Sequence, residues 1–142
     1  MIRQTMTSYQ KQKIITSIRE KLLTCEEIVF AYLHGSFLDK GDFADVDIAL
    51  FLDSAKVPKE DAISYELEKA VQLSRQVGLE IDVRVLNYAP LGFQFNVTKG
   101  RLLLTKDERL HQEFVECVWL EYMDFAAFLD ALKVYHRSKN AI

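Results

Sequence analysis

Two apolar runs decide the fold: Ile28-Val29-Phe30-Ala31-Tyr32-Leu33 and Val46-Asp47-Ile48-Ala49-Leu50-Phe51-Leu52. Both are rich in β-branched, aromatic and other apolar residues, a composition that is typical of buried strands. The first run ends at His34-Gly35-Ser36, where glycine breaks the pattern. We therefore expect two strands joined by a short segment, with one helical turn over residues 36–40.

Helical periodicity flanks these strands on both sides. Apolar residues recur at helical spacing over residues 9–23 and again over about 58–77, where Gly78 is well placed to end the helix. Residues 80–86 alternate polar and apolar side chains, which indicates a half-buried strand. The remaining predicted elements are a short helix over residues 90–97, a strand over 101–105 and a long helix that is capped by Asp107 and runs to about His136.

The order of these elements, α-β-(α)-β-α-β-α-β-α, predicts one compact α+β domain over residues 1–142. An N-terminal helical segment (residues 1–26) and a C-terminal one (107–137) flank the region that holds the strands. A chain of 142 residues with 49% hydrophobic and 27% charged residues has the size and composition of a folded soluble domain. The sequence contains no repeat, low-complexity tract or linker.

Charge and composition narrow the classes of function. A net charge of −3 and a pI of about 5.6 disfavour direct binding to nucleic acid. The N-terminus lacks the apolar core of a signal peptide, and no stretch approaches the roughly 20 apolar residues that span a bilayer. Cys25 and Cys117 match no metal-binding spacing. We therefore expect a reduced, cytoplasmic protein with no membrane contact.

Three aspartates stand out because aspartate is disfavoured in strands. Asp45 and Asp47 flank one residue and therefore point to the same face, and Asp82 lies centrally in the next predicted strand. If these strands pair, three carboxylates converge and repel one another, and a bound divalent cation offsets that repulsion. An all-oxygen ligand set favours Mg²⁺ or Mn²⁺. The alternative is that Asp45 or Asp47 simply flanks a turn.

Gly35-Ser36 follows the first strand and opens a short turn. Glycine lets the backbone approach a phosphate closely, and the serine hydroxyl and nearby N–H groups can donate to phosphate oxygens. A Gly-Ser pair alone is most often an ordinary turn. Its combination with Asp45-Val46-Asp47 at the start of the next strand makes a nucleotide-phosphate site the more specific interpretation.

The order His34-Gly35-Ser36, eight residues, Asp45-Val46-Asp47 and then Asp82 resembles the DNA polymerase β nucleotidyltransferase superfamily. Within it, the chain is most similar to the minimal nucleotidyltransferase (MNT) group, from about Ile28 to Phe125. The later part resembles MNT proteins that act as antitoxins beside HEPN-domain toxins. The residues that carry this later resemblance are Phe95-Asn96-Val97, Lys99-Gly100, Asp107-Glu108-Arg109, Phe114 and Tyr122-Met123-Asp124.

This resemblance implies a small mixed β-sheet with helices packed mainly on one face. It implies that Gly35 and Ser36 hold the triphosphate of ATP, that Asp45 and Asp47 bind Mg²⁺ or Mn²⁺, and that Asp82 is the third catalytic and metal-site carboxylate. The chain departs from many MNT members in having eight rather than ten residues between Ser36 and Asp45, and Ala44 where many have serine.

The function implied is transfer of AMP from ATP to a protein hydroxyl, namely a tyrosine of a cognate HEPN toxin, so that the chain acts as an antitoxin. Chemistry of this kind depends on positioning and charge neutralisation rather than on a special nucleophile. Two alternatives stay open: a non-catalytic antitoxin that neutralises the toxin by binding, and a nucleotidyltransferase that modifies a small molecule.

Four other features lead to expectations that a structure can test. We expect His34 to be a strand-end residue near the site and Arg84 to form a structural ion pair, since it shares a face with Asp82. His111 and His136 are expected on the surface without partners. The apolar stripe of the long helix is expected to be mostly core, with a partner-facing surface as the alternative.

Overall fold

A four-stranded mixed sheet forms the centre of the molecule. The computed structural model describes residues 3–140 of the chain. The strands are β2 (Ile28–His34), β4 (Val46–Leu52), β5 (Ile81–Val85) and β6 (Arg101–Thr105), in the order β5-β4-β2-β6. β4 pairs antiparallel with β2 and parallel with β5, so the two apolar runs form the two inner strands. The predicted α+β class with a small mixed sheet is confirmed.

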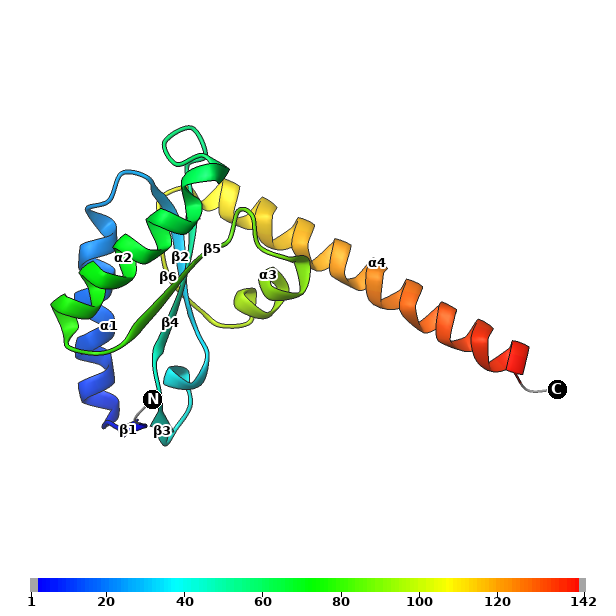
Figure 1. Cartoon of the computed structure of the whole chain (residues 1–142), viewed down its shortest axis with the longest axis horizontal. Helices are drawn as coiled ribbons and strands as arrows, with labels where there is room; N and C mark the ends of the chain where they lie inside the picture. The colour runs from blue at the N-terminus through cyan, green and yellow to red at the C-terminus, as the bar shows by residue number, and fades with distance from the viewer. Residues whose placement is uncertain (1–2, 141–142) are drawn as a thin grey trace.

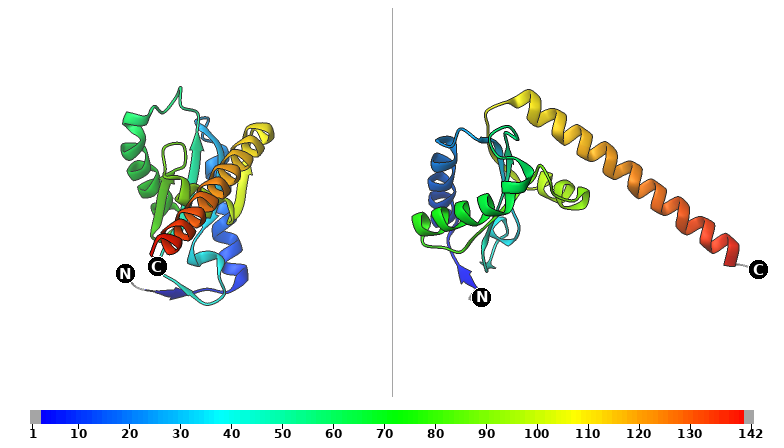
Figure 2. Two further views of the ribbon diagram at one scale, coloured as in Figure 1. Left: turned by 90° about the vertical axis from the view of Figure 1, so that its right-hand side faces the viewer. Right: turned by 45° about the horizontal axis from the view of Figure 1, so that its top comes forward.

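The helices lie on both sides of this sheet (Figures 1 and 2). α1 (Ser8–Leu23) and α2 (Ala62–Val77) cover one face of the sheet and enclose the main core. α3 (Leu91–Thr98) and the first turns of α4 (Glu108–Asn140) pack against part of the other face. Within residues 3–140, no helix combines the length and apolar character needed to cross a membrane.

Most element boundaries follow the predicted ones closely. Gly78 ends α2 in the left-handed conformation, with φ of +73°. Asp107 caps α4, since its Oδ1 accepts a hydrogen bond from the Leu110 N–H at 3.0 Å. Before α2, Pro58 leads into a short 3₁₀ turn, η2 (Lys59–Asp61), rather than directly into the α-helix.

Period-two alternation along the strands separates an apolar face from a polar one. On β4, Val46, Ile48 and Leu50 are fully buried in the main core beneath α1 and α2. Asp47 therefore points to the opposite face, where Ala49 also lies. β5 behaves in the same way, because its buried residues alternate with exposed polar ones. The alternation thus places the acidic residues of both strands on the face that α1 and α2 leave free.

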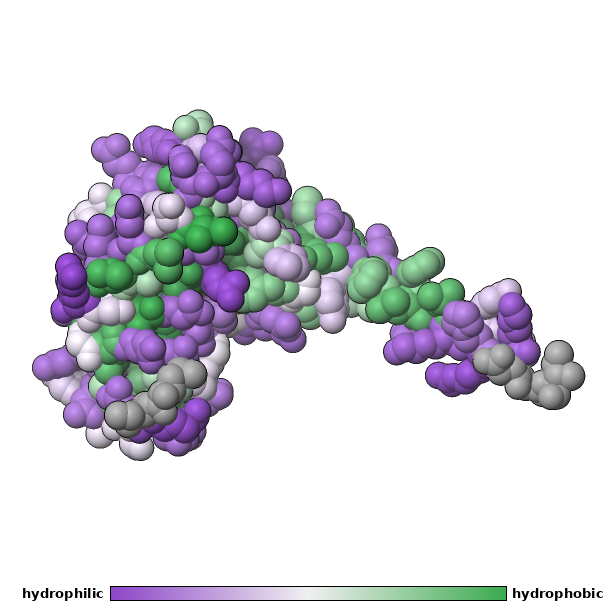
Figure 3. Space-filling view, viewed as in Figure 1, coloured by the Kyte–Doolittle hydropathy of each residue, from purple (hydrophilic) through white to green (hydrophobic). Residues whose placement is uncertain are grey.

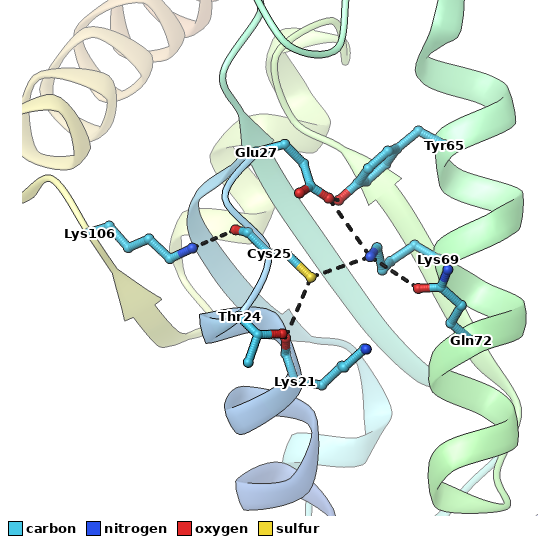
Figure 4. Close-up of polar contacts among 8 residues, drawn as sticks. All are labelled: Lys21, Thr24, Cys25, Glu27, Tyr65, Lys69, Gln72 and Lys106. Carbon is cyan, nitrogen blue, oxygen red and sulfur yellow. Dashed lines mark hydrogen bonds and ion pairs between the residues drawn. The ribbon is translucent and has the colours of Figure 1, made fainter.

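A buried lysine joins the helical layer to the start of β2 (Figure 4). Lys69 of α2 is only 7% exposed, and its Nζ lies 3.8 Å from Glu27 Oε2 and donates to Gln72 Oε1 and Cys25 Sγ. Burial would raise the pKa of Glu27, but a hydrogen bond from the Tyr65 hydroxyl and the charge of Lys69 bring that pKa below its usual value. The buried ammonium is thus paired, as a buried charge must be.

The base of α4 is fixed to the sheet and to α3 by side-chain contacts. A hydrogen bond of 2.5 Å joins the Tyr32 hydroxyl of β2 to Nε2 of His111, and the Trp119 indole N–H donates to Thr98 Oγ1 at 2.9 Å. The prediction that His111 is an unpaired surface residue is therefore wrong. The pairing joins residues 79 positions apart, and no local pattern indicates such a contact. His136 is exposed, as predicted.

The expectation that the stripe of α4 is mostly core is also wrong. Val118 is buried, but Phe125 is 51% exposed, Phe128 61% and Leu132 40%. The physical reason is length: at 1.5 Å per residue, the 33 residues of α4 extend about 50 Å. The helix therefore runs well past the sheet, and its C-terminal half projects away from the domain (Figures 1 and 2).

Candidate functional site

A polar row crosses the sheet face that α1 and α2 leave free. His34 of β2 pairs in register with Asp47 of β4, and Asp47 pairs in turn with Asp82 of β5. Residues that are directly paired on adjacent strands point to the same face, so the three side chains form one row. Asp45 lies two residues before Asp47, just outside the strand. The structure thus places the three predicted carboxylates at the same end of β4 and β5.

The electrostatics of the row centre on Asp47, which is half-buried. Burial, together with the negative charges of Asp45 and Asp82, raises the pKa of Asp47 to about 6. The nearby Arg84 guanidinium opposes this effect only in part. Ionising Asp47 is therefore costly in the folded protein, and a cation bound beside it would remove that cost.

The arrangement of the carboxylates restricts the kind of metal site that can form. Among residues 3–140, no group of three or more His, Cys, Asp and Glu side chains is arranged to hold a metal ion by itself. Mg²⁺ in nucleotide sites commonly takes one or two carboxylates and completes its octahedral shell with water and substrate phosphates. Asp45 and Asp47 fit such a site, in which part of the ligand set comes from the nucleotide.

Gly35 lies directly against the Asp47 carboxylate. Its φ is +80°, and a Cβ built on it would lie 2.1 Å from Asp47 Oδ2. Only glycine allows this close approach and this backbone conformation without strain. Ser36 follows at once and opens the 3₁₀ turn η1 (Ser36–Leu38), whose Leu38 N–H donates to the Gly35 carbonyl at 3.2 Å. The predicted phosphate residues, Gly35 and Ser36, therefore lie beside the carboxylate row.

The loop that follows Ser36 is held by α1, a support that no sequence pattern predicts. Lys11 Nζ donates to the carbonyls of Phe37 at 3.1 Å and Asp39 at 2.7 Å. Phe37 and Phe43 are both buried and meet edge to face with ring centroids 4.7 Å apart. These contacts fix both ends of the loop between Ser36 and Asp45, which is the segment that is shorter than in many MNT proteins.

A second two-stranded sheet completes the loop support and was not predicted. β1 (Gln4–Thr5) pairs antiparallel with β3 (Asp42–Phe43). Beside this pair, Arg3 Nε donates to Asp42 Oδ2 at 2.8 Å. Strands of two residues have no periodicity to detect, and only the opposite charges of Arg3 and Asp42 hinted at the pairing. The N-terminal segment thus contributes to the position of the loop.

His34 ends β2, as predicted, and packs against α3. Its ring meets Phe93 edge-on, with centroids 5.5 Å apart. Burial lowers the pKa of His34, and Arg84 lowers it further, whereas Asp82 and Asp45 act in the opposite direction. Its Nε2 is buried and finds no hydrogen-bond partner within the described part of the chain. His34 therefore lies at the edge of the row, where burial favours the neutral form of its imidazole.

The predicted ion pair of Arg84 forms only at the limit of contact. Its Nε lies 4.0 Å from Asp82 Oδ2, and both side chains are at least half exposed. The guanidinium also lies over the Phe93 ring, 5.9 Å from its centroid. An exposed pair of this length contributes little to stability. Arg84 is thus an exposed positive charge beside the row rather than a strong structural ion pair.

Comparison with known protein families decides the classification. The polymerase beta nucleotidyltransferase family matches residues 12–109. The chain belongs to this family. The matched region includes the Gly35-Ser36 turn and all three aspartates of the row. No curated protein matches the chain.

Solved structures show the same fold at low sequence identity. A chain of the complex between a tri-AMPylated Shewanella oneidensis HEPN toxin and an MNT antitoxin matches with a TM-score of 0.61 and 21% identity, covering 89% of this chain and 95% of that one. A chain of the toxin–antitoxin MntA–HepT matches with a TM-score of 0.61 and 20% identity, covering 89% of this chain and 95% of that one. A chain of a toxin–antitoxin structure with AMP-PNP matches with a TM-score of 0.63 and 21% identity, covering 86% of this chain and 94% of that one.

We expect Gly35→Ala to disable the site without unfolding the protein. Both Gly35→Ala and the control Gly78→Ala place a Cβ at a positive φ, which costs about 1–2 kcal/mol in the left-handed helical conformation of Gly78 and more at Gly35, whose ψ of −165° is a conformation essentially restricted to glycine. Only at Gly35 does the new Cβ meet Asp47, whereas nothing lies within 4 Å at Gly78. Urea denaturation should show two folded proteins with a larger loss of stability for Gly35→Ala, and calorimetric titration with magnesium–ATP should show at least tenfold weaker binding for Gly35→Ala alone. Equal nucleotide binding by both variants would contradict this role.

The raised pKa of Asp47 predicts a pH-dependent stability in the absence of metal. Between about pH 4 and pH 6 the folded protein keeps a proton on Asp47 that the unfolded chain has released, so the free energy of unfolding falls as pH rises. The substitution Asp47→Asn removes this pH-dependent contribution to the free energy of unfolding. In EDTA the variant should be more stable than the wild type by about 1 kcal/mol at pH 7.5, allowing for solvent screening, and close to it at pH 4. An advantage that is equal at both pH values would refute the assignment.

Proposed function

We propose that this chain is a Mg²⁺-dependent (or Mn²⁺-dependent) nucleotidyltransferase that transfers AMP from ATP to a protein hydroxyl. The acceptor proposed is a tyrosine of a cognate HEPN toxin, so that the chain acts as an antitoxin. The observation that carries the proposal is the approach of Gly35 to Asp47 at the centre of the carboxylate row. This contact supports the proposal because it brings the Gly35-Ser36 turn, which would bind phosphate, next to the Asp47 carboxylate, which would bind metal.

The roles follow from position. Gly35 and Ser36 would hold the triphosphate, and Asp45 and Asp47 would hold the metal ion, which when bound neutralises phosphate charge. The acceptor oxygen forms a bond to the α-phosphorus while the bond to pyrophosphate breaks. Asp82 would take the proton of the acceptor hydroxyl, a role supported by its exposure on the edge strand and its pairing with Asp47.

Solved relatives support both the nucleotide and the acceptor. One similar chain comes from a complex that contains a tri-AMPylated HEPN toxin, and another from a toxin–antitoxin structure with the ATP analogue AMP-PNP. This chain covers 95% and 94% of those chains, so the proposal concerns the whole length of the relatives. The proposed place of action is the cytoplasm, where free thiols such as Cys25 and Cys117 stay reduced.

A non-catalytic antitoxin is the second candidate. It is favoured by one observation, namely that the carboxylates of residues 3–140 do not form a metal cluster by themselves. Such a protein would neutralise the toxin by covering it, and the polar row would play no part in neutralisation. The two candidates differ in whether the toxin is modified.

The decisive variant is Asp45→Asn/Asp47→Asn, with Asp53→Asn as a control at the opposite end of β4. Incubation of the wild type with toxin, Mg²⁺ and α-labelled ATP should label the toxin. The double variant should label it at least 100-fold more slowly, because it lacks the metal-binding pair, while it still co-purifies with the toxin. Asp53→Asn should label it normally. Equal labelling by the double variant would refute the enzymatic proposal, and full neutralisation without labelling would favour the binding alternative.

A further inference from the structure

The C-terminal half of α4 carries exposed apolar side chains. We call residues 123–139 the arm. Its large apolar residues are all at least 36% exposed: Met123, Phe125, Phe128, Leu129, Leu132, Val134 and Tyr135. Figure 3 shows apolar surface on the arm at a distance from the domain. A helix that is this apolar on one face needs a covering partner to be stable in water.

The apolar stripe of the arm continues a stripe that is already packed. Val118 is buried, and Tyr122 stacks on Phe95 of α3 with ring centroids 3.8 Å apart. From Tyr122 the stripe continues through Phe125 and Leu129 to Leu132, at alternating spacings of three and four residues. This spacing is the one that packs against another helix. The first half of the stripe packs on a helix of this chain, and the second half has the same pattern without a partner in the described residues.

The arm leaves the domain on the same side as the polar row. Tyr32 lies two residues before His34 on β2, so both side chains point to one face of the sheet. Tyr32 also holds His111 at the base of α4. Figures 1 and 2 show the arm projecting from that side, with α1 and α2 behind the sheet. A protein bound along the arm is therefore on the side from which Asp47 and Asp82 are approached.

The charged residues of the arm are distributed unequally, acidic in its first half and basic in its last turns. Asp124 and Asp130 lie in its first half, whereas Lys133, Arg137 and Lys139 lie in its last turns. A partner helix that pairs with the apolar stripe is expected to carry acidic side chains opposite the basic end.

The fold match to the solved antitoxin–toxin complex covers 89% of this chain, and α4 makes up 33 of its 142 residues, so that match extends into α4.

We propose that the arm docks an amphipathic helix of the protein acceptor and so holds the acceptor hydroxyl over the polar row. This inference rests on the proposed function and adds to it the surface that selects the acceptor. The arm acts by binding and positioning, and takes no part in the chemistry. Its loss therefore weakens recognition of the protein acceptor and leaves magnesium–ATP binding intact.

The chain offers a matched control for this surface. Leu67 and Val71 of α2 are 66% and 48% exposed, close to the 61% and 40% of Phe128 and Leu132. Each pair is spaced by four residues on an exposed helix face. α2 covers the opposite face of the sheet from the polar row, so a change there adds the same charges without touching the proposed docking surface.

The test compares Phe128→Glu/Leu132→Glu with Leu67→Glu/Val71→Glu. For the arm variant, we expect the Kd for the HEPN toxin and the kcat/KM for toxin labelling each to worsen at least tenfold. Its Kd for magnesium–ATP and its circular dichroism spectrum should match those of the wild type. The α2 variant should behave as wild type in every assay.

Three outcomes would overturn the proposal. The first is an arm variant that binds and labels the toxin normally, and the second is an equal loss in the α2 variant. The third is a wild-type protein that is dimeric by analytical ultracentrifugation and becomes monomeric in the arm variant while toxin binding is unchanged, because a second copy then occupies the arm. Failure of the proposed function is distinct: it abolishes the dependence of labelling on Asp45 and Asp47 and leaves the complex with the toxin unaffected.

Discussion

The Asp47 carboxylate sits half-buried between two other negative charges, with the backbone of Gly35 against its oxygen. An isolated domain has no structural use for this arrangement, because it raises the pKa of Asp47 and costs stability near neutral pH. Much of the surrounding structure keeps it in place. β2 and β5 pair with β4 on both sides, the positive φ of Gly35 closes the turn, and Lys11 with the small N-terminal sheet supports the loop beyond it.

Repulsion between Asp47 and the carboxylates of Asp45 and Asp82 is expected in a site that binds a cation together with its substrate. Residues 3–140 hold no cluster of three or more side chains that could cage a metal ion, whereas an ion shared with phosphate groups would need only one or two carboxylates. Metal and nucleotide would then bind together, and the charge of each would lower the cost of binding the other. The exposed position of Asp82 on the edge strand leaves one side of the row open to an acceptor.

The sequence predicted those features that depend on local periodicity. The two apolar runs identified the inner strands, and the two-residue repeat placed Asp45 and Asp47 on one face, which Asp82 was expected to share only if its strand paired with theirs. Features that depend on distant segments were not predictable. β1 and β3 are too short to have a pattern, and the Tyr32–His111 bond joins residues that are 79 positions apart in the chain. The stripe of α4 revealed which face is apolar but not what covers it, so exposed residues such as Phe128 were expected in the core.

The most direct test of the central claim is a crystal structure with Mn²⁺ and a non-hydrolysable ATP analogue, with the ion located by anomalous scattering. We expect Mn²⁺ to be bound by Asp45 and Asp47 and by phosphate oxygens, with the triphosphate against Gly35 and Ser36. A nucleotide that binds elsewhere, for example in the cavity of about 480 Å³ between α1 and the loop after Ser36, would contradict it.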